Sequence, residues 1–391
     1  CLTQHIAPGS ALGPVGTVRL VPDLETFAVL PYAPHEARLL CDMLTLKGEP
    51  WENCPRWFLK RMAARAAEEG ITPRAAFKHE FYLAREVDGR FVPADDSLLL
   101  SSDGMDRAGA VIGEVLEALD RQGLEPRRYQ PELGPAQQAL MIGHAPLPAA
   151  ADRHIAVRET VRGVALRHGL VASFAPRPFP DQAGSGCRVH LSLWRNGRNL
   201  LYDRKGVLGL STLGRRFVAG ILDHLPALLA ITCPSVNSYR RLAPSMWTSA
   251  YTCWGPDNRE AAVGVPTSIK GRAEATTNIE LKPVDGSANP YLALGALVAA
   301  GLDGVKRQLD PGEPLVANPH DLSEEERRRR NIRRYPTTLA EAVAELERDE
   351  VLLEALGPPL AREYLAVRRA EWEDLGDVPP EQEVAAYFRR Y

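Results

Sequence analysis

Three stretches of the sequence each place two ionisable side chains two residues apart on a predicted β-strand. The pairs are Lys78 with Glu80, Arg188 with His190, and Glu280 with Lys282. Side chains two apart on a strand point to the same face of a sheet. Burying that many charges is costly unless they face a polar cavity, a ligand or one another. The pattern therefore predicts that these residues lie at a functional site.

Two hairpins and one further strand are predicted to carry these pairs. They are a hairpin over 74–96, a hairpin over 186–203, and a strand over 276–282. Asp88-Gly89 and Asn196-Gly197 supply the residue types that tight hairpin turns prefer. After the third strand, an asparagine followed by proline predicts the start of a buried helix.

Apolar periodicity predicts helices along most of the remaining chain. They are expected at 55–70, 105–123, 150–168, 210–231, 291–302, 338–348, 350–356 and 358–374. Short strands are expected within 16–43, another strand near 127–142, an irregular stretch over 236–254, and a charged linker beyond about 305. The chain therefore reads as an α+β protein.

Composition and net charge indicate which kinds of binding partner the protein has. The 391-residue chain is 45% hydrophobic and 25% charged, with a net charge of −3, which indicates neither a nucleic-acid nor a membrane-surface partner. The basic run Arg327 to Arg330 follows three glutamates and reads as a solvated helix face. Six cysteines, Cys1 among them, form no CxxC pair, which favours reduced thiols and a cytoplasmic setting.

Four ordered motifs resemble the glutamine synthetase superfamily. They are 184–194 (GSGCRVHLSLW), 236–242 (VNSYRRL), 254–259 (WGPDNR) and 287–294 (SANPYLAL). The resemblance implies a small N-terminal β-grasp-like domain over 1–50, expected to be incomplete, and a catalytic domain over 51–391. It further implies a curved, mostly antiparallel sheet wrapped by helices, and a homo-oligomeric ring, hexamer or dodecamer, with sites between neighbours.

The resemblance also implies ATP and two divalent metal ions, but this sequence departs from the family's ligand sets. For the first metal, Glu80 and Glu132 match carboxylate positions, while Ala139 takes the place of the third carboxylate. For the second metal, Lys78 stands at a carboxylate position and Arg188 at a histidine position. Only Glu280 survives there, so we expect one Mg²⁺ or Mn²⁺ at most and no second metal.

Charge balance gives these substitutions a common physical reason. If the strands pair as in the family, Lys78 and Arg188 should both reach Glu280 and replace a divalent ion with fixed positive charge. Such an arrangement preserves the fold without recreating a Lewis acid.

The substrate and nucleotide positions are partly retained. By resemblance, Arg259 handles phosphate, and Arg241 and Gly184 hold the amino-acid substrate. Lys282 stands where the family has an arginine, and Trp247 where many members carry a flap glutamate that deprotonates ammonium. His190 and Ser192 match nucleotide-contacting positions. A histidine on a polar strand face is more often a structural residue, and Trp247 can equally be a packing residue.

Three functions remain open on this sequence. The first is a carboxylate–amine ligase with an altered site, which joins an amine to a γ-carboxyl group; Trp247 fits an organic amine. The second is an ATP-independent γ-glutamyl or acyl transferase or lyase, with Lys78 as base or nucleophile. Lys78 can instead serve only as an ion-pair partner of Glu80 or Glu280. The third is a pseudoenzyme, a non-catalytic subunit of a ring. Family resemblance ranks the ligase first.

Overall fold

The structure is a computed structural model that describes residues 5–391, so Cys1 lies outside the described residues. Within that range an eleven-stranded sheet runs in the order β11-β12-β13-β9-β3-β6-β5, with β4, β7, β8 and β10 pairing beside this path. The strands of the sheet are β3 (Thr72–Val87), β4 (Arg90–Pro93), β5 (Pro126–Pro131), β6 (Gln137–Ile142), β7 (Ala145–Pro146), β8 (Val171–Ser173), β9 (Cys187–Arg195), β10 (Arg198–Asn199), β11 (Tyr251–Pro256), β12 (Ala261–Val265) and β13 (Ile279–Leu281).

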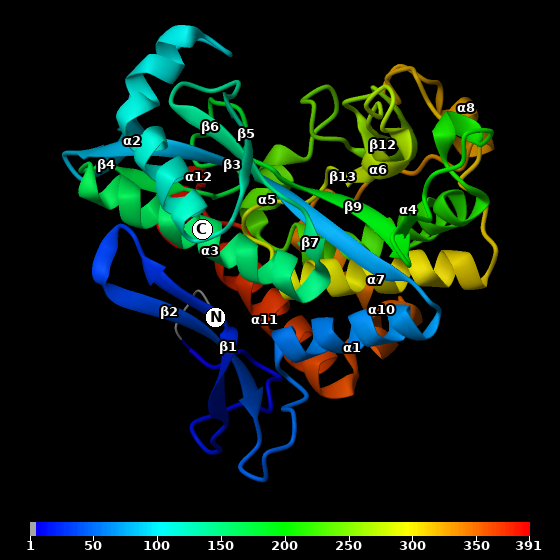
Figure 1. The fold of residues 1–391 in the computed structure, drawn as a ribbon, viewed down its shortest axis with the longest axis horizontal. Coiled ribbons are helices and arrows are strands. Elements are labelled where there is room, and N and C mark those ends of the chain that lie inside the picture. The colour runs from blue at the N-terminus through cyan, green and yellow to red at the C-terminus, as the bar shows by residue number, and fades with distance from the viewer. Residues whose placement is uncertain (1–4) are drawn as a thin grey trace.

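Helices cover one side of this sheet, as Figure 1 shows for α1, α3 and α7. The helices are α1 (Pro55–Glu68), α2 (Ser102–Arg121), α3 (Leu147–Arg167), α4 (Thr212–Thr232), α5 (Val236–Arg241), α6 (Ala273–Thr276), α7 (Pro290–Lys306), α8 (Glu324–Arg329), α9 (Leu339–Leu346), α10 (Glu350–Leu356), α11 (Pro358–Leu375) and α12 (Pro380–Phe388), with a 3₁₀ turn η1 at Val207–Gly209. The α+β class and the mostly antiparallel sheet are confirmed; only β11 and β12 pair in parallel among the described strands.

Strand pairing brings the three ionisable pairs together. In β3 and β9, Lys78 lies opposite Arg188, and in β13 and β9, Glu280 lies opposite His190. The alternating apolar residues of these strands point to the other face, where they join the main hydrophobic core with α1, α4 and α7. This alternation leaves the charged side chains on the face that the helices do not cover.

The N-terminal segment forms a separate two-stranded antiparallel sheet, β1 (Arg19–Leu30) and β2 (Ala33–Leu44). It lies beside α1 in Figure 1. Buried Arg56 on α1 joins it to the rest of the chain, since the guanidinium pairs with Asp23 on β1, Asp42 on β2 and Asp152 on α3. Three carboxylates around one guanidinium fix this sheet against two helices.

The predicted helices and both hairpins form close to their expected bounds, and several details differ. The expectation of short strands within 16–43 is wrong, because Pro22 is accommodated within the twelve-residue strand of a two-stranded sheet. The strand expected near 127–142 is two strands, β5 and β6. The stretch 236–254 contains α5, which a reciprocal Ser235–Ser238 capping box starts. The C-terminal α12 was not predicted.

Within residues 5–391, no helix is long and apolar enough to cross a membrane. The five cysteines in this range are free thiols, as expected from their spacing.

Candidate functional site

A cavity of about 630 Å³ opens on the charged face of the sheet. Its lining includes Lys78, Glu80, Glu132, Gly184, Arg188, His190, Arg241, Trp247, Arg259 and Glu280. These residues come from β3, β9, β13, α5 and the loops beside them, so the fold gathers most of the candidates onto one wall. Ser192 lies next to this group on β9, and Lys282 directly follows β13.

Lys78 bridges two carboxylates. Its Nζ donates to Glu80 Oε1 at 3.0 Å and to Glu132 Oε1 at 2.5 Å. Glu132 reaches it because the turn from β5 to β6 lies beside β3. The expectation that Lys78 would contact Glu280 is wrong, since its ammonium pairs with Glu80 and with Glu132 in the turn between β5 and β6. The ammonium instead lies between the two carboxylates that match the first metal's ligands.

Glu80 is buried beneath this ion pair. Its Oε2 accepts from the Gly186 N–H at 2.7 Å, and Arg188 Nε lies 3.7 Å from its Oε1. Burial would raise the pKa of Glu80, but the charges of Lys78 and Arg188 and the Gly186 N–H outweigh it and hold the pKa below its usual value. The carboxylate is therefore ionised and satisfied by neighbouring donors.

Glu280 is surrounded by positive charge. Arg188 Nη1 donates to its Oε1 at 3.2 Å, which confirms the expected pairing, and Lys282 Nζ lies 3.7 Å from its Oε2. Burial would raise the pKa of Glu280, but Arg188 and Lys282 together lower it to about 2. Lys282 is itself buried and donates to the main-chain carbonyls of Asn258 and Ala261, so its ammonium ties β13 to the 258–261 turn.

The two predicted nucleotide contacts behave differently. His190 lines the cavity, and its Nδ1 lies 2.9 Å from Asn278 Oδ1, with Nε2 3.9 Å from Glu280. Burial lowers the pKa of His190 and Glu280 opposes that shift, so the ring is held toward its neutral form. Ser192 Oγ accepts from Trp194 Nε1 at 2.8 Å, two residues further along β9.

Arg241 lines the cavity and is buried. Its Nη2 donates to the Val284 carbonyl at 3.1 Å, and its aliphatic stem packs on Gly184. A Cβ at Gly184 would overlap that stem, so the glycine is required for the arginine to lie here. This agrees with the motif match that singled out both residues.

Trp247 lies on a loop with an unusual backbone. Ser245, Trp247 and Ser249 all have positive φ, a strained conformation for residues other than glycine. The Glu260 carboxylate holds this loop by accepting from the main-chain N–H groups of Ser245 and Trp247. The Arg259 guanidinium stacks over the indole at 4.3 Å from the ring centroid. A cationic residue and an aromatic residue therefore form one unit at the cavity wall.

Several lining residues were not predicted from the sequence. They are Leu99, Leu100, Arg128, Gln130, Met141, Arg177 and Met246. One signal was available: Gln130 lies two residues before Glu132, and its Nε2 donates to that carboxylate at 2.9 Å. The leucines gave none, because they belong to the loop between β4 and α2 and reach the cavity only through tertiary folding.

The comparisons with known proteins agree with this geometry. Residues 52–387 match the family model for the glutamine synthetase catalytic domain. The chain belongs to the glutamine synthetase family. It is 39% identical to gamma-glutamylpolyamine synthetase GlnA3 of Streptomyces coelicolor, over 97% of this chain and 82% of that one. It is 36% identical to glutamine synthetase of Methanocaldococcus jannaschii, over 94% and 82% of the two chains.

Two solved structures share the fold. A glutamine synthase homologue covers 100% of this chain and 88% of its own, with a TM-score of 0.88 and 34% identity. The GmaS/ADP complex has a TM-score of 0.86 and 32% identity, over 96% and 86% of the two chains. These relatives confirm the resemblance and the fold class predicted from the motifs.

The residues of this site fit a pair of divalent metal ions poorly. Each of the three carboxylates that match metal-ligand positions, Glu80, Glu132 and Glu280, already pairs with a lysine or arginine. A metal ion at Glu80 and Glu132 would have to displace the Lys78 ammonium, and one at Glu280 would meet Arg188. A metal cation and a lysine or arginine side chain at the same buried position would repel each other strongly.

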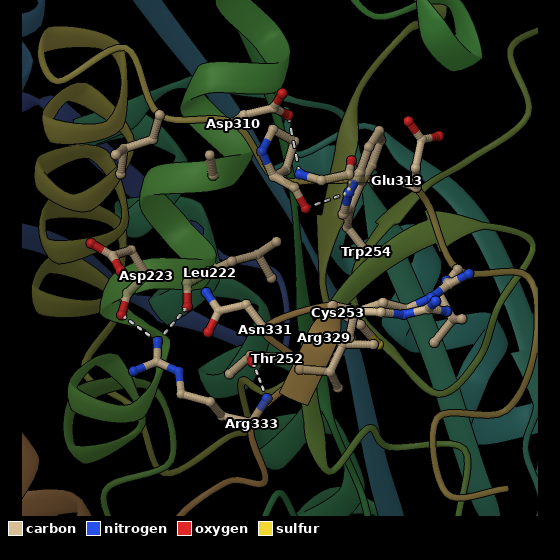
Figure 2. Close-up of a pocket in the computed structure, with 17 residues that line it drawn as sticks. Leu222, Asp223, Thr252, Cys253, Trp254, Asp310, Glu313, Arg329, Asn331 and Arg333 are labelled. Carbon is tan, nitrogen blue, oxygen red and sulfur yellow. Dashed lines mark hydrogen bonds between the residues drawn. The ribbon is translucent and has the colours of Figure 1, made fainter. Parts of the chain in front are cut away.

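A second cavity of about 520 Å³ lies between α4, β11 and the segment after α8 (Figure 2). Arg333 there donates to the main-chain carbonyls of Leu222 and Asp223, and Trp254 Nε1 donates to that of Pro311. The residues that line it are distinct from those of the charged cavity. Its polar groups hold loops together, so we do not assign it to the reaction.

Proposed function

We propose that this chain is a carboxylate–amine ligase that joins an organic amine to the γ-carboxyl group of a glutamyl-type substrate. The observation that carries the proposal is the Trp247–Arg259 unit at the cavity wall, with Met246, Leu99 and Leu100 also lining the cavity. Ammonia offers no carbon skeleton for such a wall to contact. An organic amine does, and an indole face can also contact its ammonium form.

The charge of the cavity supports an anionic partner substrate and a phosphate-bearing nucleotide. Six cationic side chains line it, against three carboxylates. The cations are Lys78, Arg128, Arg177, Arg188, Arg241 and Arg259. Fixed positive charge aimed at a transferring phosphoryl group is a general means of lowering its barrier. We propose that Lys78 and Arg188 supply charge that the family obtains from metal ions, and that the second metal site is lost.

The other roles follow from the same positions. Arg241 and Gly184 would hold the substrate's carboxylate and amino end, Arg259 would contact phosphate, and His190 would face the nucleotide. Because Ser192 is engaged by Trp194, its role would be to position that indole. We further propose a cytosolic setting, which the free cysteines support.

The test is an assay with ATP, glutamate and a panel that runs from ammonia to monoamines and polyamines. We expect phosphate release that depends on an organic amine, and a product whose mass is that of glutamate plus amine minus water. In Trp247→Ala the KM for the amine should rise about tenfold, an energy of about 1.4 kcal/mol, while the KM for glutamate stays within about twofold. Trp247→Phe, which keeps an aromatic face, should recover most of the affinity. No product with any amine would refute the ligase.

The ATP-independent alternative would use Lys78, whose ammonium lies between Glu80 and Glu132 and would first have to give up a proton to act as base or nucleophile. In such an enzyme a γ-glutamyl amide bond breaks, its amine leaves, and a bond to a second amine forms. The test omits ATP, adds a chelator, and supplies glutamine with hydroxylamine. Hydroxamate that forms in the native protein and is lost in Lys78→Met, while circular dichroism shows that the variant is folded under the assay conditions, would support this reading. Absence of turnover in both assays, together with intact rings, would support the pseudoenzyme.

A further inference from the structure

A buried cluster of two histidines and a cysteine lies on the helix side of the same strands. His79 on β3 and Cys187 on β9 are cross-strand partners, and His154 reaches them from α3. All three side chains are buried. Because strand side chains alternate, His79 lies on the opposite face from Lys78 and Glu80, and Cys187 on the opposite face from Arg188. The cluster is therefore separate from the charged cavity.

The donor atoms of the three side chains converge. His79 Nε2 lies 3.1 Å from His154 Nδ1, and Cys187 Sγ lies 3.7 Å from the same nitrogen. All three atoms lie within 4.8 Å of one another. Metal–nitrogen bonds of about 2.0 Å and metal–sulfur bonds of about 2.3 Å would place two nitrogens and one sulfur roughly 3.3–3.5 Å apart around a tetrahedral ion. The separations of 3.1 Å and 3.7 Å lie close to this range on either side.

The facing atoms of this cluster are one nitrogen of each imidazole and the thiol sulfur. The two imidazoles share a single hydrogen bond through His79 Nε2 and His154 Nδ1. The main chain of Phe77 and Leu140 hydrogen-bonds the His79 ring, as main-chain carbonyls commonly do for a metal-bound histidine. A metal ion would take up both facing nitrogens and the sulfur at once.

We propose that His79, His154 and Cys187 bind one thiophilic d¹⁰ metal ion, Zn²⁺ or Cu⁺. Imidazole and thiolate ligands suit such ions, whereas Mg²⁺ and Mn²⁺ prefer carboxylate oxygens. The buried guanidinium of Arg158 acts electrostatically on all three residues, and its own hydrogen bond goes to the Gly286 carbonyl. Its positive charge favours the ion of lower charge, since Cu⁺ and a thiolate together are neutral.

The role that follows is structural. The ion would join β3, β9 and α3 behind the strand positions that carry Lys78 and Arg188. Such a clip fixes the pairing register of the two strands, on which the geometry of the charged face depends. The proposal does not depend on which reaction the cavity catalyses.

The first experiment is a metal analysis of the tag-free full chain by inductively coupled plasma mass spectrometry. Protein is prepared from cells grown with added zinc or added copper and then dialysed against a chelator. We expect about one equivalent of one of these metals per chain, and the element found decides between the two ions. Cys187→Ser and His154→Gln should each retain at least tenfold less metal. Cys54→Ser, at another buried cysteine, is the matched control and should retain the native amount.

A second measurement keeps the test decisive if those variants fail to fold. The native chain is unfolded in chelator and refolded with Co²⁺, or with Cu⁺ in the absence of oxygen. We expect a cobalt–thiolate charge-transfer absorption in one arm or stoichiometric copper in the other. Less than about a tenth of an equivalent of metal in both preparations and after both refoldings would overturn the proposal. Equal metal retention in Cys187→Ser and Cys54→Ser would also overturn it.

Discussion

At the scale of single residues, Lys78 stands where the family has a carboxylate, and side chains rather than metal ions compensate the charge of the carboxylates that remain. Glu80 is buried and would be costly to ionise alone, so the Lys78 ammonium and the Arg188 guanidinium are required for its charge to be tolerated. The same holds for Glu280 beside Arg188 and Lys282. The charge balance of the family's site is thereby kept by side chains.

The dependence of Glu80 and Glu132 on Lys78 can be tested with Lys78→Met. Removing one partner of a buried ion pair leaves uncompensated charge, and we expect a loss of about 3–5 kcal/mol in the free energy of unfolding. Urea denaturation followed by circular dichroism measures it. Lys60→Met is the control, because Lys60 pairs with the more exposed Asp42 and should cost no more than about 1 kcal/mol. Equal losses in both variants would contradict the argument.

At the scale of elements, a group of charged side chains joins the helices α4, α7 and α10, in addition to their apolar packing. His224 on α4 lies 2.6 Å from Asp349, the N-cap of α10, and 3.0 Å from Asp303 on α7. Arg307 also pairs with Asp303. Burial would lower the pKa of His224, but the hydrogen bonds that its ring donates to the two aspartates outweigh burial and raise the pKa above its usual value.

This raised pKa predicts a dependence of stability on pH. The protonated imidazole is favoured in the folded state, so its contribution is fully present below the unfolded pKa of about 6.5 and is lost as pH rises through the folded pKa. We expect the unfolding free energy to fall over that window in the native protein. In His224→Gln the fall should be smaller, as measured by urea denaturation from pH 5.5 to 9. An unchanged pH profile in this variant would contradict the prediction.

The close contact of α4 with α7 depends on glycines. Gly220 on α4 faces the main chain of Ala300 and Gly304 on α7, and a Cβ there would overlap both. We expect Gly220→Ala to lower the melting temperature, with a cost of about 1–3 kcal/mol or more. Gly109→Ala on α2, where a Cβ meets open space, should instead be neutral or stabilise by up to about 1 kcal/mol. A thermal melt of both variants that shows no difference would be evidence against this close contact.

At the scale of the whole molecule, the N-terminal sheet exposes apolar side chains. Leu24 and Phe27 on β1 are 76% and 58% exposed. Exposed apolar groups on a sheet favour burial against another surface. We predict that a second copy of the chain covers them in a ring.

Light scattering after size exclusion tests this prediction. We expect a mass of six or twelve copies of the 42.9 kDa chain. Phe27→Glu should lower that mass, whereas Val316→Glu, on an exposed loop, should leave it unchanged. A monomeric native protein would rule out the ring.

The sequence by itself determined the parts of this protein that depend on local pattern. Alternation placed Lys78, Arg188 and Glu280 on strands with a common polar face, and contiguous motifs identified the family, because both signals lie within a few consecutive residues. The two hairpins followed from Asp-Gly and Asn-Gly turns for the same reason.

Only the tertiary structure decided which charges meet. Lys78 pairs with Glu132, 54 residues away, rather than with Glu280, because the turn after β5 lies beside β3. The His79, His154 and Cys187 cluster likewise requires a strand pair and a helix to pack together. Such contacts depend on distances between elements, and these are set by how the core fills space.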